Sequence, residues 1–139
     1  MVESDVVFAK VAQIQNCLRR IREKTQGNPA TLDSLDVQDI FVLNLQRAVQ
    51  TCIDLAAHII SDEGLGLPEN LKENFKCLER AKMVTPELSE ALQRMVGFRN
   101  IAVHEYSAID VEVLKSILVN NLEDLESFYA SILRHFHLA

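Results

Sequence analysis

The segment from Asp36 to Ser61 constrains the fold most, because it is long and apolar on almost every side. Its apolar residues are Ile40, Phe41, Val42, Leu43, Leu45, Val49, Ile53, Leu55, Ile59 and Ile60. A helix with this pattern has no broad face that prefers water. The segment therefore predicts a helix that is central in the fold or packs against two partners.

Two more long helices are indicated by spacing and by capping residues. From Ser4 to about Gln26, apolar residues recur at steps of three and four, which is typical of one buried helical face. They are Val7, Val11, Ile14, Leu18 and Ile21. The sequence "GNP" at 27–29 should end this helix. Another helix should begin at Thr85 as N-cap, with Pro86 in its first turn, and end near Val103.

The remaining elements complete an all-α fold. Pro68 is placed to open a short helix that carries Leu71, Phe75 and Leu78. Ser107 and Asp110 resemble a capping box, from which one last helix should run to His135. No strand-like alternation of useful length occurs. We therefore predict a single domain over residues 1–139, an antiparallel helical bundle of four main helices plus one short helix.

Composition narrows the functional classes. Apolar residues make up 48% of the chain, with only 4 Gly and 3 Pro, which excludes a disordered protein. The acidic start "MVESDVVFAK" and the absence of long apolar runs favour a cytoplasmic protein without a membrane segment. The net charge of −6 is unusual for a nucleic-acid binder, so any phosphate chemistry must be confined to a local pocket.

Several groups of polar residues have ordinary structural interpretations. The three cysteines form no CxxC pair and are expected to be buried thiols. A cationic cluster between Arg19 and Lys24 suits the end of its helix. The second helix carries a polar stripe, for which exposure to solvent or at a subunit surface is favoured over a polar cleft. This stripe consists of Asn44, Arg47, Thr51, Asp54 and His58. Within it, His58 is expected to hydrogen-bond Asp54 rather than a metal.

The stretch "GFRNIAVHEYSAID" breaks the apolar pattern of its helix. The face that carries Leu88, Leu92 and Met95 continues to Arg99, a cation that needs a partner or a purpose there. His104 lies five residues later, about 140° round a regular helix, so the two side chains can meet only if the chain turns near Val103.

Arginine presents a fork of donors that fits phosphate, and histidine can move a proton near neutral pH. Together they suit metal-independent cleavage of RNA by its own 2′-hydroxyl, with His104 transferring protons and Arg99 stabilising charge on the phosphate. From spacing alone, a structural ion pair or a capping role is favoured over this chemistry. His135 and His137 provide too few ligands for a metal site.

Two blocks of the sequence favour the RNA-cleavage interpretation over a structural role for Arg99 and His104. "FRNIAVHEY" (98–106) resembles the signature of the HEPN superfamily, in the R-x4-H-x-Y form typical of HepT-type toxins, and "NLQRAVQTCIDLAAHII" (44–60) resembles the second-helix block of the same group. The resemblance implies a helical bundle, usually a homodimer whose two motifs face one cleft. It implies a ribonuclease toxin paired with a minimal nucleotidyltransferase antitoxin and needing no cofactor or metal.

The resemblance also assigns roles to four residues. Arg99 and His104 would be catalytic, Asn100 would be a supporting polar residue, and Tyr106 would accept AMP from the antitoxin. Asn100 could instead make only a local hydrogen bond, and Tyr106 could be an ordinary buried aromatic residue. As an alternative function, the chain would be a non-catalytic module that binds the nucleotidyltransferase, or a structural dimer without chemistry.

Overall fold

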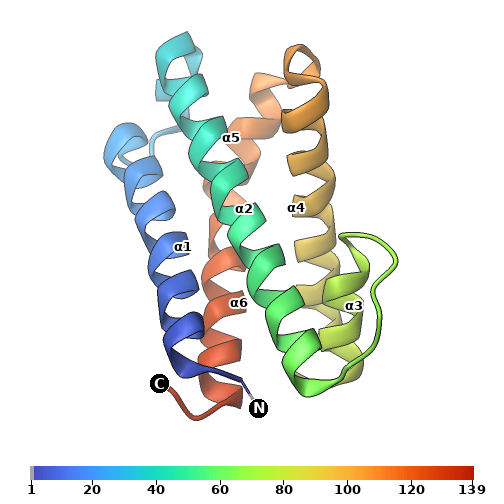
Figure 1. Ribbon diagram of the computed structural model, residues 1–139. Helices are drawn as coiled ribbons and strands as arrows, with labels where there is room; N and C mark the ends of the chain where they lie inside the picture. Colours follow the sequence, from blue (N-terminus) through green and yellow to red (C-terminus); the bar gives the residue numbers. More distant parts are fainter. Residues whose placement is uncertain (1) are drawn as a thin grey trace.

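The computed structural model describes residues 2–139, which form six α-helices and two short 3₁₀ helices (Figure 1). The α-helices are α1 (Ser4–Thr25), α2 (Leu35–Glu63), α3 (Glu73–Arg80), α4 (Pro86–His104), α5 (Val111–Asn120) and α6 (Leu122–His135). The 3₁₀ helices are η1 (Pro29–Asp33) and η2 (Tyr106–Ala108). Within the described range there is no strand, so the all-α prediction is confirmed.

Helix α2 is the centre of the bundle, as its sequence predicts. It contacts each of the other five α-helices and η1. In Figure 1, α1 and α4 run in one direction on either side of α2, and α2 and α6 run in the other. Phe41, Leu45 and Leu55 of α2 are completely buried. The antiparallel arrangement follows from short connections between long helices.

Helix α1 confirms the prediction made from its spacing. The five apolar residues of its stripe are 0% to 5% exposed. The helix ends at Gln26, which has left-handed backbone angles and donates its N–H to the carbonyl of Arg22. Gly27 follows with φ of 71°, a conformation that glycine adopts without a steric penalty.

The predicted last helix is in fact two helices. Helix α5 ends at Asn120 and α6 begins at Leu122. Asn121 breaks the segment, and its side-chain amide donates a hydrogen bond to Asp124 (3.2 Å). Asparagine favours such local hydrogen bonds over a helix interior. The apolar spacing continues across the break, so periodicity alone did not indicate it.

Two predicted helix starts are also wrong. Asp110, not Ser107, caps α5, because Ser107 lies in η2 and the Asp110 carboxylate accepts the N–H of Glu112. Helix α3 begins at Glu73 rather than after Pro68. The side chain of Asn70 accepts a hydrogen bond from the backbone N–H of Glu73 (3.0 Å). This local hydrogen bond favours a helix start at Glu73 over one directly after Pro68.

Cys52 and Cys77 are buried as expected, whereas Cys17 is only partly buried. Burial raises the pKa of both the Cys17 and Cys52 thiols, which keeps them protonated and unreactive. In the part of the chain that the structure describes, no helix is both long and apolar enough to cross a bilayer.

Candidate active site

Helix α4 carries the motif and begins as predicted. The Thr85 side chain accepts the N–H of Leu88 (3.1 Å), and Pro86 occupies the first turn. Leu92 and Met95 are buried, and Arg99 continues their face as a half-buried side chain. The predicted position of Arg99 on the packed face is therefore confirmed.

His104 does not turn back toward Arg99. Helix α4 continues through His104, and Glu105 still donates its N–H to the carbonyl of Ile101 (2.8 Å). The chain therefore turns too late for the two side chains to meet. On this regular helix they point about 140° apart. Arg99 faces the bundle, whereas His104 is exposed at the helix end.

Arg99 opens onto a hollow of about 620 Å³, which we call the Arg99 groove. Its lining side chains come from α1, α2 and α4. They are Gln13, Asn16, Cys17, Gln46, Arg47, Gln50, Thr51 and Arg99. The lining therefore contains two arginines and four neutral amides, and no carboxylate. In a chain of net charge −6, this is a local surface suited to an anion.

The guanidinium of Arg99 retains hydrogen-bonding capacity. Its Nη1 donates to the side chain of Asn100 (3.0 Å), so Asn100 does make the local hydrogen bond that was one of its two interpretations. The buried Nε of Arg99 has no hydrogen-bond partner within residues 2–139, and neither does the buried Oε1 of Gln50 in the same groove. Buried polar atoms without partners are costly, which favours a site that a ligand or another chain completes.

The polar stripe of α2 is exposed as expected at Arg47 and Asp54, whereas the expectation of exposure is wrong for Asn44 and Thr51. Asn44 and Thr51 are buried and donate to the carbonyls of Ile40 and Arg47 on their own helix (both 2.8 Å). Arg47 and Thr51 also line the Arg99 groove. A side chain that satisfies itself on its own helix can be buried, and spacing does not reveal this.

Tyr106 is 48% exposed, so the interpretation as an ordinary buried aromatic residue is wrong. It lies in η2, directly after α4. Its hydroxyl donates a hydrogen bond to the carboxylate of Asp39, near the start of α2. The start of α2 and the end of α4 lie at the same end of the bundle (Figure 1). Local burial and the Asp39 carboxylate together raise the pKa of Tyr106 to about 12.

Other charged residues have partners away from this region. Both terminal nitrogens of Arg22 donate to the carboxylate of Glu126 (2.7 and 3.1 Å), and Nε of Arg19 lies 3.7 Å from Oε1 of Glu23. Nε2 of His58 lies 3.1 Å from Oδ2 of Asp62, one turn later, so the expected pairing of His58 with Asp54 is wrong. Residues 2–139 contain no group of three or more His, Cys, Asp or Glu placed to hold a metal.

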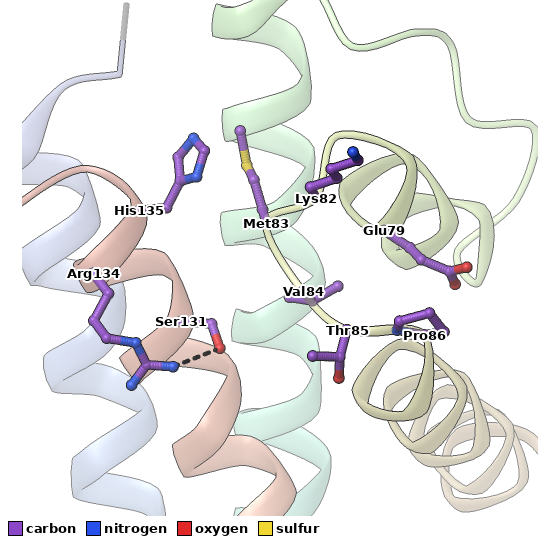
Figure 2. A pocket seen from close by; sticks show the side chains of 9 residues that line it. All are labelled: Glu79, Lys82, Met83, Val84, Thr85, Pro86, Ser131, Arg134 and His135. Atoms are coloured by element: carbon purple, nitrogen blue, oxygen red, sulfur yellow. Dashed lines mark hydrogen bonds between the residues drawn. The ribbon is translucent and has the colours of Figure 1, made fainter.

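A slightly larger hollow, about 650 Å³, lies between the α3–α4 connection and the end of α6 (Figure 2). Its charged side chains do not converge. Arg134 turns toward Ser131, which it contacts at 3.4 Å, while Lys82 lies across the hollow and His135 lies beside Met83. This hollow therefore does not compete with the Arg99 groove as a candidate site.

Comparison with known proteins identifies the group to which this structure belongs. Residues 14–132 match the family described as "Ribonuclease HepT-like". The chain belongs to this family. It is 35% identical over 125 residues to an mRNA nuclease HepT from Shewanella oneidensis, an alignment that covers 90% of this chain and 94% of that protein.

Two solved structures extend the similarity to the fold. A toxin–antitoxin structure with AMP-PNP matches with a TM-score of 0.89 and 34% identity, over 94% of this chain and 98% of that one. The second is a tri-AMPylated HEPN toxin from Shewanella oneidensis in complex with an MNT antitoxin. It matches with a TM-score of 0.87 and 35% identity over the same shares.

The sequence motif did not reveal every residue of this region. Gln13, Asn16 and Gln50 of the Arg99 groove look like ordinary surface amides in the sequence. Asp39 lies 67 residues from Tyr106, and no local spacing connects them. Only the antiparallel pairing of α2 and α4 brings these two side chains together.

Proposed function

We propose that this chain is the ribonuclease toxin of a toxin–antitoxin pair, a metal-independent endoribonuclease that acts through Arg99 and His104. The observation that carries this proposal is the Arg99 groove. It places a half-buried guanidinium with an unpartnered Nε donor among neutral amides. The 35% identical relative from Shewanella oneidensis is an mRNA nuclease, which supports RNA as the substrate.

Arg99 has the chemistry to stabilise the reacting phosphate. The charge on the non-bridging oxygens grows as a phosphodiester is attacked, and a preorganised guanidinium lowers the energy of that state. Asn100 holds one end of the guanidinium (3.0 Å) and thereby limits its rotation. This is the supporting role that the motif assigns to Asn100.

His104 has the chemistry to move protons. An exposed imidazole can take the proton of the RNA 2′-hydroxyl or return one to the departing 5′-oxygen. The attacking oxygen is the 2′-hydroxyl of the RNA itself, so the products would carry 2′,3′-cyclic phosphate and 5′-hydroxyl ends. The scheme requires neither a metal nor a cofactor.

A homodimer would complete this site. Arg99 and His104 of one chain point about 140° apart, so one phosphate is reached more readily by Arg99 of one copy and His104 of the other. The end of α4 exposes Ile101 (45%) and Val103 (41%), apolar side chains that a second copy could cover. Two-fold symmetry would bring both motifs to one cleft.

The proposed antitoxin is a minimal nucleotidyltransferase that transfers AMP to Tyr106. The exposure of Tyr106 and the tri-AMPylated state of a related toxin support this proposal. A phosphodiester on Tyr106 would add bulk and negative charge near the end of α4. It would then repel an RNA phosphate from the same surface without unfolding the protein.

One observation favours a second candidate function. The net charge of −6 suits a non-catalytic module that binds the nucleotidyltransferase better than it suits an RNA-binding protein. In that case the end of α4 would be a docking and modification surface.

Cleavage of a labelled RNA in EDTA separates the two functions. Wild-type protein should cleave it to 2′,3′-cyclic phosphate ends, and His104→Ala should be slower by about 10² to 10⁴-fold. His135→Ala, which changes another exposed histidine, is the control and should cleave like the wild type. Equal cleavage by the wild type and His104→Ala, or none by unmodified wild type, would favour the binding module.

A further inference from the structure

The hydrogen bond between Tyr106 and Asp39 is the feature that the proposed cleavage reaction leaves unused. It joins the turn after α4 to the first two turns of α2. Asp39 is the fifth residue of α2, so its carboxylate lies close to the end of the bundle that carries η2. Both side chains are exposed, and a partner protein can therefore reach the pair.

The environment of Tyr106 creates a chemical problem for its modification. A phenol attacks phosphorus well only as it loses its proton. With its pKa raised to about 12, Tyr106 is almost entirely protonated at neutral pH. Its attack therefore needs a group that removes the proton as the new bond forms. The Asp39 carboxylate already accepts that proton in a hydrogen bond.

We propose that Asp39 is the general base for AMP transfer to Tyr106, so that the toxin itself supplies the proton acceptor for its own neutralisation. This inference rests on the proposed function of Tyr106 as the AMP acceptor. The AMP donor is ATP bound by the nucleotidyltransferase. Oη of Tyr106 bonds to the α-phosphorus, the bond from that phosphorus to the bridging oxygen breaks, and pyrophosphate leaves with the electron pair. The phenol proton passes to Asp39 and then to solvent.

The same pair also favours departure of the product from Asp39. Once Oη is esterified it has no hydrogen to donate, so the bond to Asp39 is lost. The new phosphodiester is an anion beside a carboxylate, and like charges repel. The attached AMP should therefore turn away from the start of α2, which leaves the carboxylate exposed.

Asp39 could act as a general base or only as a charge that keeps the phenol neutral. The two roles predict opposite effects of Asp39→Asn on the rate of AMP transfer. The asparagine can still accept a hydrogen bond, but it removes the charge that helps to raise the pKa of Tyr106. If Asp39 only held the phenol neutral, the variant would be modified faster. If Asp39 accepts the proton, the variant should be slower although its phenol is more acidic.

The experiment measures AMP transfer to purified, unmodified toxin by the nucleotidyltransferase proposed as its antitoxin, with magnesium and ATP. Wild type, Asp39→Asn and Asp36→Asn are compared, the last being an exposed carboxylate on the same helix. Asp39→Asn should lower kcat by about 10² to 10⁴-fold with little change in KM for the toxin. Its rate should rise with pH as phenolate forms, and Asp36→Asn should behave like wild type. Thermal melting of each variant verifies its folding.

Three outcomes would overturn the inference. Asp39→Asn could be modified as fast as wild type, which would place the base on the nucleotidyltransferase. Its rate could fall equally at every pH, which would make Asp39 a positioning residue. Alternatively, wild type could remain unmodified at Tyr106, shown by peptide mass spectrometry with Tyr106→Phe as reference. That last result would also refute the proposed neutralisation, whereas the first two would leave it standing.

Discussion

The α1–α2 contact and the end of α4 differ in how completely their side chains are buried. Along α1 and α2, many apolar side chains are completely buried, among them Ile14, Phe41 and Leu45, which are 0% exposed. At the end of α4, Ile101, Val103 and Tyr106 are each more than 40% exposed, and Arg99 keeps an unpartnered Nε. Packing explains the first region. The second contains side chains that the folding of one chain does not require, as expected of a surface retained for chemistry or binding.

The largest expected effect is on stability in the packed region. Phe41→Ala should lower the free energy of unfolding by about 3 to 5 kcal/mol, because it removes a buried ring and leaves a cavity. Leu43→Ala changes a 44% exposed side chain on the same helix and should cost much less. Denaturant unfolding of both variants measures the difference. Equal losses would contradict the assignment of Phe41 to the buried core and of Leu43 to the surface of α2.

The second effect should appear in activity and not in stability. Arg99→Lys keeps the positive charge but loses the planar fork of donors, and RNA cleavage should fall by about 10² to 10³-fold. Arg94→Lys, an exposed residue of α4 that pairs with Glu90, is the matched control. Initial cleavage rates and melting temperatures are compared. A cleavage rate unaffected by Arg99→Lys would remove Arg99 from the site.

A smaller effect is expected for the ion pair between α1 and α6. Arg22 and Glu126 make two contacts but remain partly exposed, so a double-mutant cycle to alanine should give a coupling of about 0.5 to 1 kcal/mol. The looser pair of Arg19 and Glu23 (3.7 Å) should give less. A coupling near zero for Arg22 and Glu126 would leave apolar burial as the main contact between these helices.

The smallest expected effect is a decrease in the free energy of unfolding at high pH, as Tyr106 loses its proton. In a Tyr129→Phe background, Tyr106 is the single tyrosine and its ultraviolet titration should have a midpoint near pH 12. Asp39→Asn should lower this midpoint while leaving it above 10, because burial is the larger cause. Since the folded pKa is raised, the associated stability is present below pH 10 and is lost between about 10 and 12. A midpoint near 10 in both proteins would exclude the hydrogen bond.

Features that depend on local apolar spacing or capping could be predicted from the sequence, and features that depend on side-chain hydrogen bonds could not. Helices α1 and α2 were predictable because their apolar spacing reports directly on burial, and Thr85 with Pro86 fixed the start of α4 because capping is local. The break at Asn121 and the start of α3 at Glu73 were not, since side-chain hydrogen bonds select them without changing the apolar pattern. Arg99 could be placed on its face from spacing alone.

The bond between Tyr106 and Asp39 depends on how α2 and α4 pair, which spacing cannot supply. The same holds for the Arg99 groove, which collects side chains from three helices. Local patterns therefore predicted which residue of α4 faces the bundle, and the tertiary structure determined what lies around it.

The central claim is that RNA cleavage needs Arg99 and His104, supplied together by two copies of the chain. It is tested most directly by co-expressing Arg99→Ala and His104→Ala chains with different affinity tags and purifying the mixed dimer through both tags. Each variant alone should be inactive. The mixed dimer retains one intact pair of residues, so it should recover about half of the wild-type cleavage rate. A mixed dimer as inactive as its parents, or failure of the two chains to associate, would contradict the account.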